Sequence, residues 1–244
     1  GQHDLAVENY EECIAALSFK KNKINSSNSI LNTNTISKSQ EKKTIERYAE
    51  PEVDYKPTLF TAYKRMAFSL LQLNRLEEAD VVIDNCFGDD FLSINNAEKL
   101  DAKRIKASIF LKQGKQDESL GLLLNALEEE KKQGLQEGEV KTLMAIASLY
   151  QQTKREGRAI DYYQQAKNLA DKINNTELSL SINNSMAQIF RQQKNINKEL
   201  ETRSNSIELS NIISKKMDAA LDEEKSAVGY SADKQALSFK ELAK

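Results

Sequence analysis

The sequence predicts an all-α fold, an α-solenoid of antiparallel helical hairpins, and two observations lead to this prediction. Of 244 residues only two are Pro, eight are Gly and none is Trp, whereas a β fold of this size needs more turn-forming, β-branched and aromatic residues. The second observation is an internal repeat. Alanine recurs every 40 residues, at Ala67, Ala107, Ala147, Ala187 and Ala227. This register indicates an array of similar helical units.

The clearest unit is "VKTLMAIASLYQQTKREGRAIDYYQQAKNLADKI", within residues 137–176. Its first helix carries large, large, small and aromatic residues in that order, and its second carries small, aromatic and small residues. Small side chains let two antiparallel helices approach closely, and the tyrosines fill the gaps beside them. The positions are Leu143, Ile146, Ala147, Tyr150, Ala159, Tyr163 and Ala166.

This order and spacing resembles the tetratricopeptide repeat. The standard repeat has about 34 residues, so this longer period resembles the long-helix variants of kinesin-light-chain-like repeats and of bacterial tetratricopeptide sensors and regulators. About six extra residues shared between two helices would lengthen each by nearly one turn. The resemblance implies a right-handed superhelix whose A helices line the concave face. HEAT-type repeats have a similar length but lack the small–aromatic–small order, and remain a minor alternative.

Residues 1–20 read as half of a repeat. Ala6, Tyr10 and Cys13 occupy the small–aromatic–small positions of a helix B, and Gly1 stands where a turn residue closes the preceding helix. The matching helix A is missing from the sequence. We therefore expect that the chain was cut from a longer array.

Residues 21–56 are predicted to be a low-complexity insertion. Ala6 and Ala79 are 73 residues apart, one period plus 33. The Asn, Ser, Thr and Lys content cannot bury enough apolar surface to offset ordering, so much of 22–41 is expected to be mobile or weakly helical. "EKKTIERYAE" could form a short helix before Pro51. A loop without a role and a docking arm are both compatible with this segment.

Four repeats are expected to follow the insertion, and they match unequally. Lys106 stands where a large apolar residue is expected. In the fourth repeat Asn183, Glu199 and Arg203 occupy positions that usually pack, so its helix B is either less buried or covered by a partner. The predicted boundaries are 57–96, 97–136, 137–176 and 177–214.

Residues 215–244 are predicted to form an incomplete or capping repeat. Ala227 and Tyr230 keep the register, but Phe239 falls where a small residue belongs. A shortened turn would restore the match.

The residue types needed for catalysis or metal binding are scarce. The only histidine is His3, in a predicted turn, which excludes His-based triads and His-rich metal sites within this chain. Cys13 and Cys86 read as small buried side chains, and no glycine-rich phosphate loop, H-E-x-x-H or C-x-x-C occurs. "GDDFLSINNAE" lacks the closing Glu of an EF-hand. We expect no enzymatic activity, no cofactor and no metal.

Charge is nearly balanced, with 35 Lys and Arg against 37 Asp and Glu. No global basic field therefore favours nucleic acid, and no apolar run is long enough to predict membrane insertion. The acidic runs stand near Lys or Arg at helical spacing and read as solvated faces. The cytoplasm and the periplasmic side of a bacterial envelope both remain open, as does the oligomeric state.

The predicted binding surface is the face of each helix A that points away from helix B. Its residues are mostly cationic or amide, with a few apolar members. Such chemistry suits an extended or helical peptide, because amides can bond its backbone and cations can pair with acidic residues or a C-terminus. The set is Lys64, Phe68, Arg104, Ser108, Lys112, Lys141, Met144, Ser148, Gln152, Asn184, Gln188 and Arg191.

One group of tetratricopeptide domains grips the C-terminal carboxylate of chaperones through Lys and Asn on successive A helices. Here Phe68 and Ser108 occupy the positions where Asn would be needed. Recognition of chaperone tails is therefore disfavoured.

Three functions are compatible with these features. The first is a non-catalytic scaffold that binds a protein or peptide, an acidic one included. The second is the sensory region of a signalling protein such as a bacterial sensor histidine kinase, because the long repeats and "DEEKSAVGY" resemble tetratricopeptide arrays that precede kinase modules. The third is a structural subunit of an envelope or secretion assembly.

Overall fold

A computed structural model describes the secondary structure of residues 2–33 and 54–242, and the side chains of residues 2–18 and 54–221. Within these ranges the regular structure is helical throughout, which confirms the all-α prediction. The chain divides into two compact units, Gly1–Gln133 and Gly134–Lys244.

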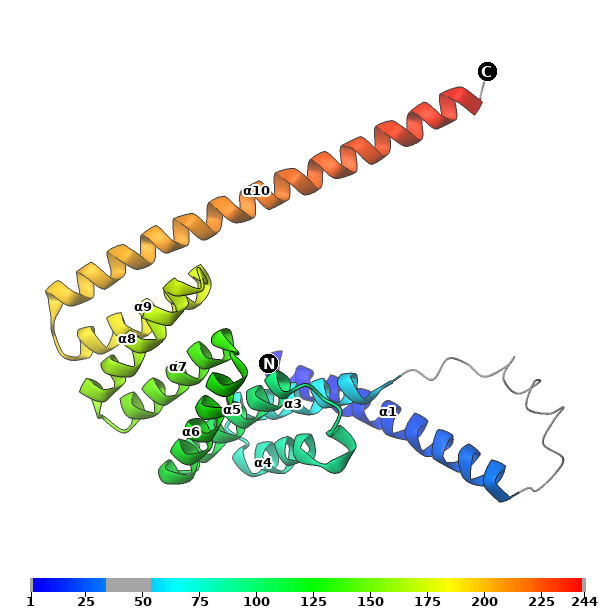
Figure 1. The fold of residues 1–244 in the computed structure, drawn as a ribbon, viewed down its shortest axis with the longest axis horizontal. Coiled ribbons are helices and arrows are strands. Elements are labelled where there is room, and N and C mark those ends of the chain that lie inside the picture. The colour runs from blue at the N-terminus through cyan, green and yellow to red at the C-terminus, as the bar shows by residue number, and fades with distance from the viewer. Residues whose placement is uncertain (1, 34–53, 243–244) are drawn as a thin grey trace. The chain divides into compact units, whose positions relative to one another are not determined.

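The first unit contains a single helix followed by two helical hairpins (Figure 1). α1 packs against α3, each hairpin packs internally, and α5 contacts both α3 and α4. Two short 3-10 turns, Asn85–Phe87 and Asp89–Phe91, join the hairpins. The helices are α1 (Gln2–Thr33), α3 (Lys56–Gln72), α4 (Leu76–Asp84), α5 (Asn96–Lys112) and α6 (Gln116–Gln133).

The second unit contains two further hairpins. α7 packs against α8, α9 packs against α10, and α9 also contacts α7 and α8. Its helices are α7 (Gln136–Gln152), α8 (Glu156–Lys172), α9 (Thr176–Gln192) and α10 (Ile196–Leu242). The A helices α3, α5, α7 and α9 thus begin at residues 56, 96, 136 and 176, in step with the alanine register.

The small residues lie where the helices of a hairpin meet. Ala67, Ala107, Ala147 and Ala187 on the A helices are buried, as are Ala79, Ser119 and Ala159 on the B helices. The Ser119 hydroxyl donates to the carbonyl of Ala107 at 2.7 Å, so this buried polar group is satisfied. Close approach of the backbones explains why small side chains recur at these positions.

The turns between helices repeat as regularly as the alanines. Among the described turns, each except the connection between α4 and α5 has one residue with a positive φ, the conformation that ends a helix in a Schellman motif. After α3, for example, Asn74 N–H donates to the Leu71 carbonyl (3.2 Å) and Arg75 N–H to the Leu70 carbonyl (2.9 Å). The positive-φ residues are Asn74, Gly114, Lys154 and Lys194 between A and B helices, and Gly134 and Asn174 between repeats.

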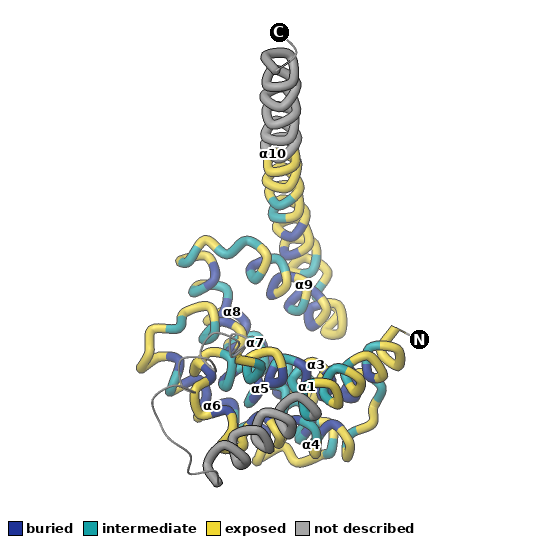
Figure 2. The backbone as a smooth tube through the Cα atoms, turned by 90° about the vertical axis from the view of Figure 1, so that its right-hand side faces the viewer, coloured by how far each residue is buried: buried dark blue, intermediate teal, exposed yellow. Residues whose placement is uncertain are grey.

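α10 differs from the expected boundary at residue 214, because it continues without a turn to Leu242. The turn residues Gly134 and Asn174 tolerate positive φ, whereas the next position in this register is Ser214. At Ser214 the helix continues where the preceding B helices end. Residues 214–221 are all exposed (Figure 2).

α1 also extends further than expected, into the segment predicted to be an insertion, and ends at Thr33. Val7 is buried against α3, and Tyr10, Ile14 and Leu17 pack beside it. The predicted short helix in "EKKTIERYAE" and the role of Gly1 lie outside the described residues.

Lys106 adapts to a position where an apolar residue was expected. Its ammonium lies 5.7 Å from the centre of the Phe87 ring and 5.4 Å from that of Phe110, and it pairs with Asp84. A lysine can bury its alkyl stem while its charge remains paired. The apolar position is thus filled by the stem of a cation.

Helix B of the fourth repeat, α10, buries only polar side chains among its described residues. Of the described residues of α10, Thr202 and Ser206 are buried. Glu199, at the small position, accepts hydrogen bonds from Arg191 (3.1 Å) and Arg203 (2.9 Å). Exposed ion pairs replace apolar packing there, in line with the interpretation that this helix B is less buried.

Candidate functional site

In the first unit the predicted binding residues divide into paired cations and exposed groups. Lys64 and Phe68 lie on α3, and Arg104, Ser108 and Lys112 lie on α5. The Lys64 and Arg104 side chains are 13% and 11% exposed, whereas Phe68 is 46% exposed. Phe68 therefore presents an aromatic ring to solvent.

Lys64 and Arg104 belong to one ionic network. The Lys64 ammonium donates to Glu98 (2.5 Å) and Asp101 (2.8 Å) on α5. The Arg104 guanidinium donates to Asp101 (3.0 Å) and pairs with Glu130 of α6, which is 1% exposed. The network links α3, α5 and α6, so both cations already have acidic partners within the chain.

The pKa values of the network follow from these contacts. Burial alone would lower the pKa of Lys64, but hydrogen bonds to Asp101 and Glu98 outweigh it and raise the pKa. Burial alone would raise the pKa of Asp101, but the hydrogen bond from Lys64 and the charges of Lys64 and Arg104 lower it. Both groups therefore stay charged over a wider pH range than usual.

Ser108 bonds its own helix, and Lys112 reaches the end of α3. The Ser108 hydroxyl donates to the Arg104 carbonyl (3.0 Å), and the exposed Lys112 ammonium donates to the Leu71 carbonyl (3.3 Å) at the end of α3. Serine at this spacing bonds its own helix and contributes little to a partner.

In the second unit the set lies on α7 and α9, which contact each other. Lys141, Gln152, Asn184, Gln188 and Arg191 are exposed. The Lys141 ammonium donates to Glu137 (2.6 Å) within its helix, and the Gln152 amide donates to Ser148 (3.2 Å). Met144 and Ser148 are half-buried between these groups. This face is polar, rich in amides and open to solvent.

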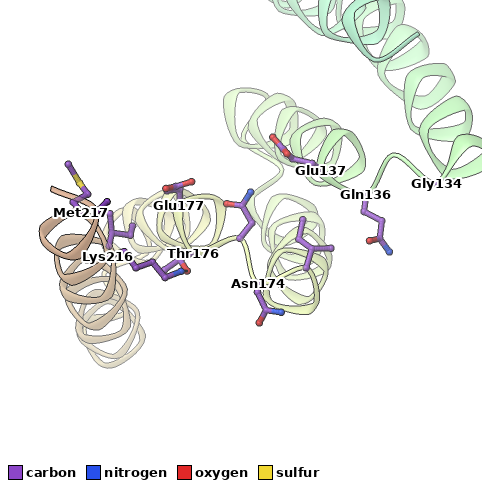
Figure 3. A pocket seen from close by; sticks show the side chains of 12 residues that line it. Gly134, Gln136, Glu137, Asn174, Thr176, Glu177, Lys216 and Met217 are labelled. Carbon is purple, nitrogen blue, oxygen red and sulfur yellow. The ribbon is translucent and has the colours of Figure 1, made fainter. Parts of the chain in front are cut away.

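A cavity of about 630 Å³ lies in the second unit, where α10 continues past the repeat length. Lys216 and Met217 project from α10, Thr176 and Glu177 lie at the start of α9, and Glu137 lies at the start of α7 (Figure 3). The full lining is Gly134, Gln136, Glu137, Ile173, Asn174, Asn175, Thr176, Glu177, Ile213, Lys216, Met217 and Ala220. Sequence reasoning did not predict this cavity, because it placed a boundary at residue 214, whereas Lys216, Met217 and Ala220 of the continuing helix form part of the lining.

Among the described residues there is no group of three His, Cys, Asp or Glu side chains that could hold a metal ion. Cys86 is buried, and burial raises the pKa of its thiol to about 12. A thiol with so high a pKa is a poor nucleophile at neutral pH. In the part of the chain that the structure describes, no helix has the length and apolar content needed to cross a membrane.

Residues 140–173, which form most of α7 and α8, match the family model of the tetratricopeptide repeat. This part of the chain is a tetratricopeptide repeat. The matched span lies within the unit in which the large, small and aromatic positions are best kept. No curated protein matches the sequence.

Solved structures share the helical-repeat fold of this chain at low sequence identity. PlcR of Bacillus thuringiensis, in complex with the peptide PapR7 and DNA, has a TM-score of 0.56 at 12% identity over 85% of this chain and 70% of its own. A Rap protein complexed with competence and sporulation factor has a TM-score of 0.55 at 9% identity over 86% of this chain and 76% of its own.

A third similar structure is a signal transduction ATPase with numerous domains from Pyrococcus horikoshii, which has a tetratricopeptide repeat sensor. Its TM-score is 0.53 at 22% identity, over 71% of this chain and 27% of that protein. At these identities the comparison supports the fold.

Proposed function

We propose that this chain is a non-catalytic scaffold that binds a protein or peptide through the exposed face of its A helices. The observation that supports it best is the polar face of α7 and α9. There Gln152, Asn184 and Gln188 are exposed, while the opposite side of the same helices is buried in the hairpins.

Amides at these positions suit a peptide backbone. Each carries a donor and an acceptor, so it can bond both the N–H and the C=O of an extended segment. Asn184 and Gln188 are four residues apart on α9 and project from the same side of the helix. They could thus contact successive groups along one bound chain.

The cations give weaker support to an acidic partner. Arg104 and Lys64 are paired within the chain, so releasing them to a partner would cost the interactions of the network. Lys141 is more exposed and pairs with Glu137 within its own helix, a type of ion pair that contributes little to stability. Lys141 is the better candidate for pairing with a partner's carboxylate.

The printed complexes of two similar structures favour the same class of function. PlcR is in complex with the peptide PapR7, and the Rap protein with competence and sporulation factor. Both carry a helical-repeat fold of comparable extent. A peptide or small protein factor is accordingly the partner class proposed for this chain.

The test is selection of peptides from a displayed random library on the wild-type chain, followed by binding measurements on variants. The double variant Asn184→Ala with Gln188→Ala should weaken the selected peptide at least about tenfold, since losing one or two hydrogen bonds costs about 1.4 kcal/mol or more. The matched control is Gln165→Ala, an exposed amide on α8.

Charge reversal separates the contribution of the cations. Lys141→Glu should weaken the capture of an acidic peptide further, because Lys141 is exposed and its partner Glu137 lies in its own helix. Undiminished capture by the amide and charge variants, with helical content unchanged, would show that the binding surface lies elsewhere.

A second candidate is the sensory region of a signalling protein. One structural neighbour carries its tetratricopeptide repeats as a sensor, and α10 continues as one helix beyond the repeat length. A helix that extends from the array could transmit a change at α9, which it packs against. If so, the selected peptide should slow hydrogen exchange in α10 beyond residue 213. Unchanged exchange there would contradict the sensory function, and the scaffold function would be the remaining candidate.

A further inference from the structure

A second cavity of the second unit lies away from the proposed binding face. It has a volume of about 270 Å³ and is bounded by α8, α9 and α10. Phe190, Met186 and Ile160 form apolar parts of its wall. Its other lining residues are Gln164, Lys167, Asn183, Lys198, Glu201, Thr202 and Asn205.

Asn183 is the unusual member of this lining. It is 2% exposed, and its Nδ2 has no hydrogen-bond partner among the described residues. In the 40-residue register its counterpart in the third repeat is Leu143, which is buried and apolar. A buried amide without a partner is unfavourable, so this position points to a bound group that accepts a hydrogen bond.

The third repeat shows what fills the corresponding place. There Tyr162 of α8 stacks on Tyr150 of α7, with ring centres 5.5 Å apart and planes inclined by 19°. In the fourth repeat Phe190 stands in the register of Tyr150, but Thr202 stands in that of Tyr162. The fourth repeat thus keeps an aromatic platform, the ring of Phe190, but has the small side chain of Thr202 in place of the ring that stacks on it.

The cation above the platform is also kept. Arg158 lies 5.5 Å from the centre of the Tyr150 ring, and Lys198, at the same register position, lies 5.5 Å from that of Phe190. The fourth repeat therefore retains two of the three groups of this aromatic cluster. The cavity lies beside them.

The first unit closes the corresponding place in another way. Lys103, in the register of Asn183, donates to Asn125 (3.0 Å), which is in the register of Asn205. The Lys106 ammonium, in the register of Met186, lies near the rings of Phe87 and Phe110. In the first unit the polar side chains at these positions thus have partners, Asn125 for Lys103 and the two aromatic rings for Lys106.

We propose that the cavity between α8, α9 and α10 accepts the phenol ring of a tyrosine from a partner peptide. The ring would stack on Phe190 as Tyr162 stacks on Tyr150, and its hydroxyl oxygen would accept a hydrogen bond from Asn183 Nδ2. This site is separate from the A-helix face, so the inference does not depend on the proposed function.

The dimensions and charges of the cavity favour a phenol. Its volume lies just below the range of about 300–1,000 Å³ typical of drug-sized ligands, which suits one side chain rather than a cofactor. The Lys167 ammonium already donates to Asp171 at 2.6 Å, and Lys198 lies over the Phe190 ring. A neutral aromatic group with one polar atom therefore fits better than a strong anion.

The test uses N-acetyl-tyrosinamide and N-acetyl-phenylalaninamide as probes on the full chain. The tyrosine probe at millimolar concentration should shift the side-chain amide resonances of Asn183, and the phenylalanine probe should shift them less. Thr202→Tyr restores the missing ring within the chain. It should raise the midpoint of thermal unfolding and reduce the probe-induced shift at least tenfold.

Two further variants make the result specific. Ser210→Tyr places the same ring on an exposed position of α10 outside the cavity, and should leave the probe shift unchanged. Asn183→Leu introduces the residue of the third repeat and removes the side-chain amide, so binding is followed through the backbone amide resonances of α9, and the preference for tyrosine over phenylalanine should disappear. The inference is overturned if the tyrosine probe leaves the Asn183 amide unshifted, as when water alone occupies the cavity. It is also overturned if the shift persists in Thr202→Tyr.

Discussion

Asp101 shows how one carboxylate can hold several helices. It accepts hydrogen bonds from Lys64 of α3 and from Arg104 of its own helix, and Arg104 in turn pairs with Glu130 of α6. These contacts lower the pKa of Asp101 despite its partial burial. Lys64 and Arg104, which were predicted from the sequence to lie on the binding face, therefore also hold the helices of the first unit together.

Asp101→Asn should lower the free energy of unfolding at neutral pH by about 1 kcal/mol, because the carboxylate is 41% exposed and partly screened. Since the folded pKa is depressed, this contribution is present above the unfolded pKa of about 3.9 and is lost as pH falls through the folded value. Urea unfolding near neutral pH and at about pH 3 or below measures the difference, which should shrink in acid.

The control for this prediction is Glu128→Gln, which removes an exposed ion pair with Lys132 within α6. It should change stability little at either pH, because exposed pairs within one helix contribute little. A loss in Asp101→Asn that is independent of pH would contradict an electrostatic origin.

At the scale of elements, the turns define where each hairpin ends. Gly and Asn hold four of the positive-φ positions, but Lys154 and Lys194 hold the other two. A lysine pays a conformational cost there that glycine does not. The register of turns is therefore kept even where the residue is unfavourable.

Lys154→Gly should raise the free energy of unfolding by about 0.5–1 kcal/mol, because it relieves the strain of positive φ. Lys132→Gly, within α6, provides the comparison and should lower it by about 1 kcal/mol. Chemical denaturation of both variants measures these changes. Equal destabilisation by both would show that residue 154 does not adopt the left-handed conformation.

At the scale of the whole molecule, the chain separates into two compact units, and the repeats within each unit contact one another. Stability in such arrays is close to a sum of local and nearest-neighbour contributions. A defect in one unit should therefore have its largest effect nearby.

Leu100→Ala removes a side chain of α5 that is 1% exposed, and should cost about 2–4 kcal/mol through the cavity it leaves. Hydrogen exchange followed by mass spectrometry should then show faster exchange in α3 to α6 than in α9 and α10. Equal acceleration along all helices would contradict the division into two units.

The sequence by itself predicted the all-α fold and the register of helices and small residues, because close packing of two backbones restricts a position to Ala or Ser, as at Ala79, Ser119 and Ala159. Ala67, Ala107, Ala147 and Ala187 are buried as that reasoning requires. The sequence also selected the A-helix residues that remain a proposed binding face. These features depend on local periodicity, which is visible in one dimension.

The tertiary structure alone decided how individual polar residues are used. Lys106 fills an apolar position with its stem, Lys64 and Arg104 are paired within the chain, and α10 continues past Ser214. The small Thr202 side chain beside Phe190, and the buried Asn183 amide that has no partner among the described residues, emerge only when residues from three helices are brought together. Such features depend on which side chains contact each other across helices, and the spacing of residues in the sequence does not specify these contacts.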